Sequence, residues 1–175
     1  MKIQKENILI KKCNLDNLDS IYELQQIVVD MFREEEKGYY LPFSKEDLEK
    51  VLLDSKEYGE IHASFYENKM IGWVFLSVHK DIEKLLEHIP HITGQSGDID
   101  GVMVHPDYRG NNIQTMLLEY IFEIAKNKDI ENILAEITIG NTYSFNNIYK
   151  LDFKKEGEYF KNNTIQRDIL VKKIQ

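Results

Sequence analysis

The sequence predicts a single α/β domain in which helices flank a mixed, mostly antiparallel central sheet of about six or seven strands. Three observations lead to this fold class. The chain has 175 residues, 42% of them hydrophobic, which suits one domain with one core. Only 3 prolines occur, and no repeat or low-complexity tract marks a linker. Apolar residues alternate along the chain between strand spacing and helical spacing. We therefore expect one domain over residues 1–175.

The charge balance and the cysteine content exclude several classes of function. With 22 Lys and Arg residues against 30 Asp and Glu residues, the formal net charge is −8, and no basic cluster occurs. We therefore expect neither a nucleic acid nor a membrane as a partner. Apolar runs are too short for a membrane span or a secretory signal, so the expected location is the cytoplasm. The single cysteine, Cys13, agrees with a reducing compartment and is expected to be buried.

The first half of the chain is predicted to begin with a short strand, Ile8 to Cys13, followed by two helices. Apolar residues recur at helical spacing from Leu18 through about Lys37, where Gly38 would end the first helix. Ser44 with Asp47 resembles a capping box that opens the second helix. The remaining elements of this half are a hairpin, Ile61 to Tyr66 and Met70 to Val78 joined by the turn Glu67 to Lys69, and a short helix with a loop over Lys80 to Gly97.

The second half is more regular, with a strand, loop, helix and strand in succession at its centre. A long amphipathic helix with apolar residues from Ile113 to Ile124 lies between its first two strands. The other predicted elements are strands at Asp98 to Val104 and Ile133 to Ile139, a helix at Tyr143 to Leu151, and strands near Phe153 to Phe160 and Thr164 to Val171 joined by a turn at Asn162 and Asn163.

The segment DGVMVHPDYRGNNIQTMLLEYIFEIAKN, residues 100–127, is typical of an anion-binding loop. A strand ends at His105, a tight polar loop runs to about Asn112, and a long helix starts at once. The first backbone N–H groups of such a helix have no intrahelical partners and lie at the positive end of the helix dipole, an arrangement that binds phosphate. Arg109 adds a positive charge, and Gly110 allows close approach of a ligand to the backbone.

At this loop the sequence resembles the GCN5-related N-acetyltransferases, the GNAT family. The family loop reads R/Q-x-x-G-x-G/A and grips the pyrophosphate of acetyl-CoA; residues 109–114, RGNNIQ, fill its six positions. VMVHPDY resembles the strand that leads into this loop. IGNTYSFNNIYKLDF, residues 139–153, resembles a second stretch of the family, in which Asn141, Ser144 and Phe153 match and Asp152 replaces a glycine. The resemblance is clearest over residues 98–160.

Two departures from the family pattern bear on function. Asn112 and Gln114 replace the small residues of the loop, and Asn112 is expected to preserve a left-handed turn because Asn tolerates that conformation. The tyrosine that in the family can protonate the leaving thiolate falls at Ile148. Tyr149, one position further, is the substitute we consider, although one step along a helix rotates a side chain by about 100°.

The resemblance implies an acetyl-CoA-dependent N-acetyltransferase that moves an acetyl group to a primary amine by direct transfer in a ternary complex. By the same resemblance, the strand backbone at Val102 to Val104 would pair with pantetheine, and Asn141 would hydrogen-bond it. No metal is expected, because the histidines lack ligand spacing. The residues expected to bind acetyl-CoA are Val102, Met103, Val104, Arg109, Gly110, Asn111, Asn112, Ile113, Gln114, Thr115, Asn141 and Ser144.

The reaction needs a base, because an amine with a pKa near 10.4 is neutral in only about one molecule in a few thousand at pH 7. Asp98 and Asp100 share one face of their predicted strand, and Glu136 lies on the next. These three carboxylates and Tyr149 are the candidate catalytic residues. The alternative for the carboxylates is a position at a strand end facing solvent, and for Tyr149 a packing role.

A second function remains open: a non-catalytic module that binds or senses acyl-CoA, suggested by Ile148 and the altered loop. A cleft closed by Lys80 to Gly97 would favour this sensor, and an open, charge-lined cleft would favour the enzyme. For the enzyme, the acidic surface favours a cationic acceptor, such as a polyamine, an aminoglycoside or a lysine. The acceptor can be a small molecule or a protein amine, and the resemblance allows a homodimer.

Overall fold

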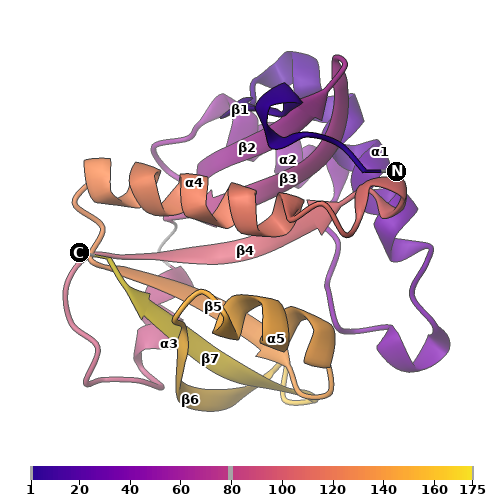
Figure 1. The fold of residues 1–175 in the computed structure, drawn as a ribbon. Helices are drawn as coiled ribbons and strands as arrows, with labels where there is room; N and C mark the ends of the chain where they lie inside the picture. Colours follow the sequence, from indigo (N-terminus) through magenta and orange to yellow (C-terminus); the bar gives the residue numbers. More distant parts are fainter. Residues whose placement is uncertain (1, 79–80, 175) are drawn as a thin grey trace.

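The computed structural model describes residues 2–78 and 81–174, which form a seven-stranded sheet with helices on both faces (Figure 1). The strand order is β1-β2-β3-β4-β5-β7-β6. β4 and β5 run parallel, and the other neighbouring strands are antiparallel, so the predicted fold class is confirmed. The strands are β1 Leu9–Lys12, β2 Gly59–Tyr66, β3 Lys69–Ser77, β4 Ser96–Val104, β5 Asn132–Thr138, β6 Lys154–Lys161 and β7 Ile165–Lys173.

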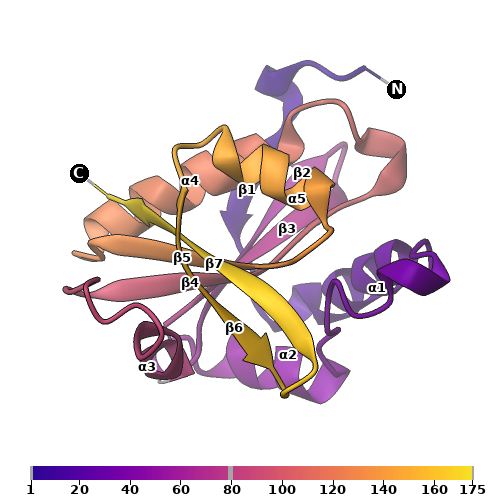
Figure 2. The same ribbon diagram turned by 90° about the horizontal axis from the view of Figure 1, so that it is seen from below.

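The helices lie in two layers, one on each face of the sheet (Figure 2). α4 (Ile113–Asn127) and α5 (Thr142–Tyr149) cover one face, and α1 (Leu18–Val29), α2 (Lys45–Leu53) and α3 (Asp81–Leu86) cover the other. Within the described residues, no helix is long and apolar enough to cross a bilayer.

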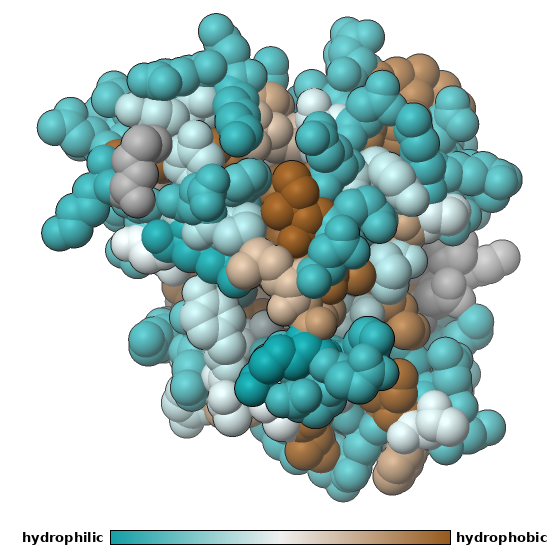
Figure 3. Space-filling model, turned by 90° about the vertical axis from the view of Figure 1, so that its right-hand side faces the viewer, coloured by the Kyte–Doolittle hydropathy of each residue, from teal (hydrophilic) through white to brown (hydrophobic). Residues whose placement is uncertain are grey.

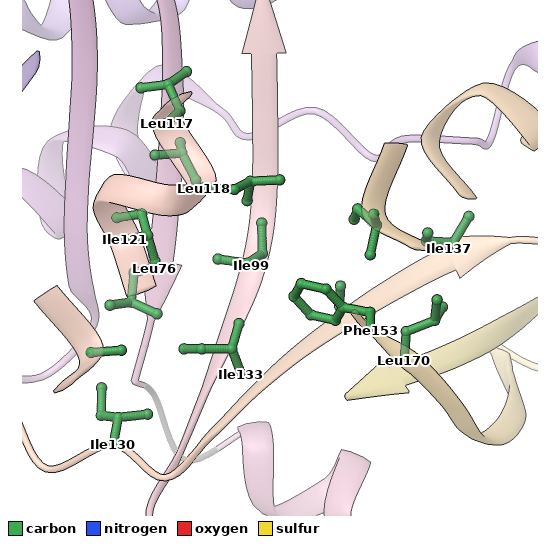
Figure 4. Close-up of a cluster of buried hydrophobic side chains, with 14 of the residues drawn as sticks. Leu76, Ile99, Leu117, Leu118, Ile121, Ile130, Ile133, Ile137, Phe153 and Leu170 are labelled. Atoms are coloured by element: carbon green, nitrogen blue, oxygen red, sulfur yellow. The ribbon is translucent and has the colours of Figure 1, made fainter. Parts of the chain in front are cut away.

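Apolar side chains fill the space between the sheet and each helical layer. Under α4, Leu117, Leu118 and Ile121 pack among buried strand residues (Figure 4). The apolar residues that recur at helical spacing in α4 are therefore the ones that its packing on the sheet buries. On the opposite face, a second cluster lies under α1 and α2 and a third under α3; their fully buried members include Ile21, Leu48, Trp73, Ile89 and Ile169. Cys13 is buried in the second cluster, as expected.

Both predicted hairpins form, with turns that match their sequences. Glu67 and Asn68 have φ values of 48° and 64°, and Asn162 and Asn163 have values of 54° and 59°. Two consecutive residues with positive φ give the turn whose twist suits an antiparallel pair, and Asn adopts this conformation readily. Ser44 Oγ accepts a hydrogen bond from the Asp47 N–H at 3.1 Å, which confirms the predicted start of α2.

The first helix is shorter than the sequence predicts. α1 ends at Val29 rather than near Lys37, and Gly38 lies in the following loop. Arg33 has an extended backbone (ψ 164°), and its N–H donates to the Glu36 carboxylate at 2.9 Å, which begins a separate 3-10 turn. A local bond between side chain and backbone thus competes with continuation of the helix. We call residues 30–43 the 30–43 loop.

The sheet opens between its two parallel strands. β4 and β5 pair with each other only over Ser96–Asp98 and Asn132–Leu134. Beyond these residues β4 remains paired with β3, and β5 with β7. The register of β4 on β3 also shifts, because Phe75 pairs with Gly101 and Leu76 with Ile99. Asp100 is therefore the inserted residue of a β-bulge, a feature that increases local twist.

Candidate functional site

A cavity of about 540 Å³ lies where β4 and β5 separate. It is lined by β4, the loop before α4 and the first turn of α4, β5, the start of α5, and the 30–43 loop. Figure 3 views the side of the molecule on which β4 and β5 end, and apolar side chains lie in the middle of that face with hydrophilic ones around them. The sequence segments singled out for chemistry therefore meet at one site.

The loop before α4 has the backbone shape that an anion needs. Gly110 and Asn112 have φ values of 79° and 58°, so Asn112 is left-handed, as expected. A Cβ atom built at Gly110 would meet nothing within 4 Å, which leaves open space beside the backbone. The Met116 N–H donates to the Asn112 carbonyl at 3.0 Å, the first bond of the helix. The three preceding N–H groups therefore have no intrahelical partner.

These three N–H groups belong to Ile113, Gln114 and Thr115, which line the cavity together with Arg109 and Gly110. Free N–H groups, the positive end of the α4 dipole and the Arg109 charge together favour a phosphate at this place. The residues present therefore fit the diphosphate of a coenzyme A.

Asn111 has a different position from its neighbours in the loop and is not among the cavity-lining residues. Its Oδ1 accepts a hydrogen bond from the Ile3 N–H at 3.0 Å, and its Nδ2 donates to the Tyr108 carbonyl at 2.8 Å. The side chain predicted to bind cofactor thus ties the loop to the N-terminal segment.

Beyond the point of separation, β4 presents an open edge to the cavity. Val102, Met103 and Val104 line it. The His105 N–H donates to the Ile71 carbonyl on β3 at 2.9 Å. Because successive residues of a strand point their N–H groups to opposite sides, those of Val102 and Val104 point toward β5. An extended chain such as pantetheine fits there as an added strand.

The start of α5 borders the same space. Asn141 caps this helix, its Oδ1 accepting a hydrogen bond from the Ser144 N–H at 3.1 Å, and both residues line the cavity. Asn147 Nδ2 donates to Gln114 Oε1 at 3.0 Å. Gln114, which departs from the family pattern, therefore connects α4 to α5.

The structure separates Tyr149 from the other predicted catalytic residues. Its side chain is 59% exposed and stacks on Phe145 with ring centroids 5.6 Å apart. Tyr149 is not among the cavity-lining residues, whereas Ile148 is. One step along the helix rotates the side chain by about 100°, which explains this difference.

The three predicted carboxylates come together at the cavity. Asp98, Asp100 and Glu136 all line it. Ile99, Ala135 and Ile137 pack on the α4 side of the sheet, so the adjacent Asp98 and Glu136 face the opposite side. Asp98 and Glu136 thus lie across the sheet from the loop before α4, and one cavity connects them with that loop.

Glu136 and Asp98 have different surroundings. Glu136 accepts hydrogen bonds from the Tyr159 hydroxyl, from Lys161 Nζ at 3.2 Å and from Arg167 Nη1 at 3.1 Å. Asp98 is 5% exposed, and its Oδ1 has no hydrogen-bond partner among the described residues. Burial raises the pKa of Asp98 well above its usual value, and the negative charges of Asp100 and Glu136 raise it further.

Arg167, on β7, is a site residue that the sequence did not indicate. It is 6% exposed and lines the cavity, and its Nε and Nη2 atoms have no partner among the described residues. The alternation of residues along the strand could have indicated it, because Arg167 shares a strand face with the buried Ile169 and Val171. An arginine at such a position is seldom fully buried unless it is paired.

The 30–43 loop forms a further wall of the cavity and is fixed by Gln25. This fully buried residue of α1 accepts hydrogen bonds at Oε1 from the Tyr40 hydroxyl and the Phe43 N–H, both at 3.0 Å. Its Nε2 donates to the Phe43 carbonyl at 2.8 Å. Phe32, Tyr39 and Tyr40 of the loop line the cavity, whereas none of residues 82–97 does.

The sequence could have indicated Gln25, because this polar residue lies among the apolar positions of α1. Burial, followed by the charge of Asp100, raises the pKa of Tyr40. Its hydroxyl is therefore neutral and acts as a hydrogen-bond donor. Among the described residues, no group of His, Cys, Asp and Glu is arranged to hold a metal ion.

Comparison with known proteins gives the same fold. Ribosomal-protein-S18-alanine N-acetyltransferase from Escherichia coli superimposes with a TM-score of 0.71 at 15% identity, covering 96% of this chain and 94% of that one. The protein yncA from Salmonella typhimurium, solved with its cofactor acetyl-CoA, gives 0.72 at 12% identity, covering 97% and 95%. PaiA N-acetyltransferase from Thermoplasma acidophilum, in complex with coenzyme A, gives 0.67 at 21% identity, covering 95% and 98%.

A sequence comparison identifies the family. No curated protein matches the chain. The profile described as the acetyltransferase (GNAT) family, however, matches residues 21–153, well over half of the chain. This match includes the loop before α4, the open edge of β4 and the start of α5. The chain therefore belongs to the acetyltransferase (GNAT) family.

Proposed function

We propose that this protein is an N-acetyltransferase that moves an acetyl group from acetyl-CoA to a primary amine by direct transfer in a ternary complex. The observation that carries the proposal is the single cavity with two different ends. The loop before α4 and the edge of β4 suit a coenzyme A, and buried carboxylates suit an amine on the other face of the sheet. Donor and acceptor then fit side by side.

Each part of the cavity has a separate task in this proposal. Arg109 and the N–H groups at the start of α4 hold the diphosphate, and the edge of β4 positions the pantetheine. Bound acetyl-CoA would supply the acetyl group as a thioester. The negative charges of Asp100 and Glu136 attract the ammonium form of the acceptor.

Asp98 is the base in this proposal. Glu136 already accepts three hydrogen bonds, so it is less suited to take a proton. Asp98 has an unpartnered oxygen and a raised pKa, which brings its proton affinity closer to that of a base working near neutral pH. It takes a proton from the ammonium, directly or through water, and so produces the neutral amine.

The position of residues 82–97 supports the enzyme over the sensor. A sensor was expected to have a cleft closed by Lys80 to Gly97, of which Lys80 and the Asp81 side chain lie outside the described part of the chain. No residue of 82–97 lines the cavity, and carboxylates line its acceptor part. This open, charge-lined arrangement is the one expected of the enzyme.

Calorimetric titration with acetyl-CoA tests the proposal. We expect one site per chain, and Arg109→Ala should weaken binding by about 10- to 100-fold because it removes a charge-assisted contact to phosphate. Arg33→Ala is the matched control, since Arg33 is 70% exposed and does not line the cavity. Absence of binding at millimolar acetyl-CoA would reject the proposed function.

A further inference from the structure

Two buried groups of opposite charge lie in the acceptor part of the cavity with polar atoms left unpartnered. Arg167 uses Nη1 for Glu136 at 3.1 Å, and its Nε and Nη2 atoms are buried without a partner among the described residues. Asp98 Oδ1 is in the same state. Leaving polar atoms of buried charged groups without hydrogen-bond partners is costly, so a ligand that bonds to these atoms of both groups would gain affinity from them.

The free atoms of Arg167 form a recognisable binding edge. Nε and Nη2 lie along one side of the planar guanidinium, and this side donates two parallel hydrogen bonds to a carboxylate. The bond to Glu136 holds the other part of the group in place. With a side chain 8% exposed, Arg167 is a fixed, buried donor pair rather than a mobile surface charge.

Asp98 and Arg167 are close enough to influence each other but do not form an ion pair within 4.0 Å. Burial is the main cause of the raised Asp98 pKa, and the charges of Lys161 and Arg167 act in the opposite direction. Both residues line the cavity, so an acceptor that carries both charges can lie between them.

We propose that the acceptor is a free amino acid, whose carboxylate binds the Nε and Nη2 edge of Arg167 while its amino group lies at Asp98. This inference rests on the proposed function and names its substrate class. The ammonium loses two protons in the reaction. One leaves to water through Asp98, and the other ends on the sulfur of coenzyme A as the N–C bond forms and the C–S bond breaks.

Other amines fit this pair of charges less well. A polyamine would bring a second cation toward Arg167, and a peptide N-terminus would offer a neutral amide where the carboxylate belongs. Either leaves the Arg167 donors without an acceptor, and a site with unpaired buried polar groups discriminates strongly against such a ligand. The structure thus points away from the cationic acceptor that the net charge favours.

Paired acceptors test the inference. Each of the common L-amino acids is compared with its carboxamide by the rate of coenzyme A release. We expect at least one amino acid whose kcat/KM exceeds that of its amide by about 100-fold. The amide has the less basic amine and therefore more of the neutral, reactive form, so intrinsic reactivity cannot produce this preference. Rates within about threefold for every pair that reacts would overturn the inference.

Variants assign the preference to Arg167. Arg167→Lys keeps the charge but loses the pair of parallel donors. The ratio of kcat/KM for the amino acid to kcat/KM for its carboxamide should therefore fall by about tenfold or more. Lys155→Gln is the control: Lys155 contacts Asp168 at 2.8 Å on the same hairpin and does not line the cavity, so the ratio should persist. An unchanged ratio in Arg167→Lys would overturn the assignment.

A binding measurement decides the matter even if no acceptor reacts. The sequence has three arginines, Arg33, Arg109 and Arg167, whose Nε–H signals can be assigned by substitution and followed by NMR. In the presence of coenzyme A, acetate should shift the Arg167 signal and acetamide should not. No shift with acetate would overturn the inference. If acetyl-CoA failed to bind in the calorimetric titration, the proposed function would be rejected. A shift of the Arg167 signal with acetate would still support a carboxylate-binding site in that case.

Discussion

Asp98 combines burial, an unpartnered oxygen and a place in the cavity, and these properties define its expected behaviour. Because its pKa is raised, it holds a proton at acidic pH and must lose it to act as a base. The rate should therefore rise with pH through this elevated pKa. Asp98→Asn should abolish this rise of the rate with pH and lower kcat by about 100-fold or more, which the pH dependence of kcat would reveal.

Asp152→Asn is the matched control for this substitution. Asp152 has a side chain 93% exposed and a left-handed φ of 64°, which Asn also tolerates. We expect normal kcat and an unchanged pH profile in this variant. If kcat of the Asp98→Asn enzyme rose with pH as it does in the wild type, another group would be the base.

Glu60 provides a prediction about stability rather than catalysis. Burial disfavours its charge, but hydrogen bonds from Lys12, Lys128 and His62 prevail and lower its pKa to about 2. A carboxyl group whose pKa is lower in the folded than in the unfolded protein stabilises the fold at pH values above its unfolded-state pKa. This stabilisation is lost as the pH falls through the folded-state pKa. The wild type should exceed Glu60→Gln by about 1 kcal/mol in the free energy of unfolding at pH 6, after allowance for solvent screening. Urea titrations should show this difference vanishing near pH 2.

Residues whose roles depend on local sequence could be predicted, and residues whose roles depend on distant contacts could not. Asn112 was expected to be left-handed because that property belongs to the turn itself. Arg167 acquires its role from Glu136, on the neighbouring strand β5. Gln25 acquires its role from Phe43, at the far end of the 30–43 loop. No local pattern contains those partners.

The 30–43 loop is the element whose position depends most clearly on a single side chain. Gln25 makes three hydrogen bonds to Tyr40 and Phe43. Gln25→Ala should leave buried polar groups of the loop without partners and destabilise the protein by about 2 kcal/mol. It should also raise KM for the acceptor more than it weakens acetyl-CoA binding, because Tyr40 of the loop lies close enough to Asp100 for that charge to raise the Tyr40 pKa.

The neighbouring residue offers a matched control for this variant. Gln26→Ala makes the same change on α1 at a half-buried position outside the cavity lining, so acceptor KM should stay near the wild-type value. Thermal unfolding and steady-state kinetics measure both effects. Equal KM in Gln25→Ala and Gln26→Ala would show that the loop keeps its place without Gln25.

Elements with a self-contained signal were predicted well, and elements shaped by their surroundings were not. α4 has a complete apolar face, and both hairpins have turns that favour positive φ. α1 ends instead where turns replace its regular backbone bonds at Met31 and Phe32, although apolar spacing extends past this point. The bulge at Asp100 is a property of pairing between β3 and β4, which no single strand encodes.

For the whole molecule, the short pairing of β4 with β5 makes a prediction about hydrogen exchange. The N–H groups of Val102 and Val104 point to the open side of β4 and should exchange readily in the free protein. If pantetheine adds there as a strand, acetyl-CoA should slow their exchange by about tenfold or more. The Cys13 N–H, which donates to the Ile61 carbonyl at 2.8 Å in the distant β1 and β2 pair, reports any global stabilisation. Equal slowing at all three positions would contradict strand addition.

The same short pairing gives the ligand a mechanical role. Three residue pairs join the β1–β4 part of the sheet to the β5–β7 part along its hydrogen-bonded edge. A coenzyme A lying along β4 and reaching α5 would contact both parts of the sheet and so hold them together. Unfolding of the free protein would then be less cooperative than unfolding of the complex, and the cofactor would complete the sheet as well as supply the acetyl group.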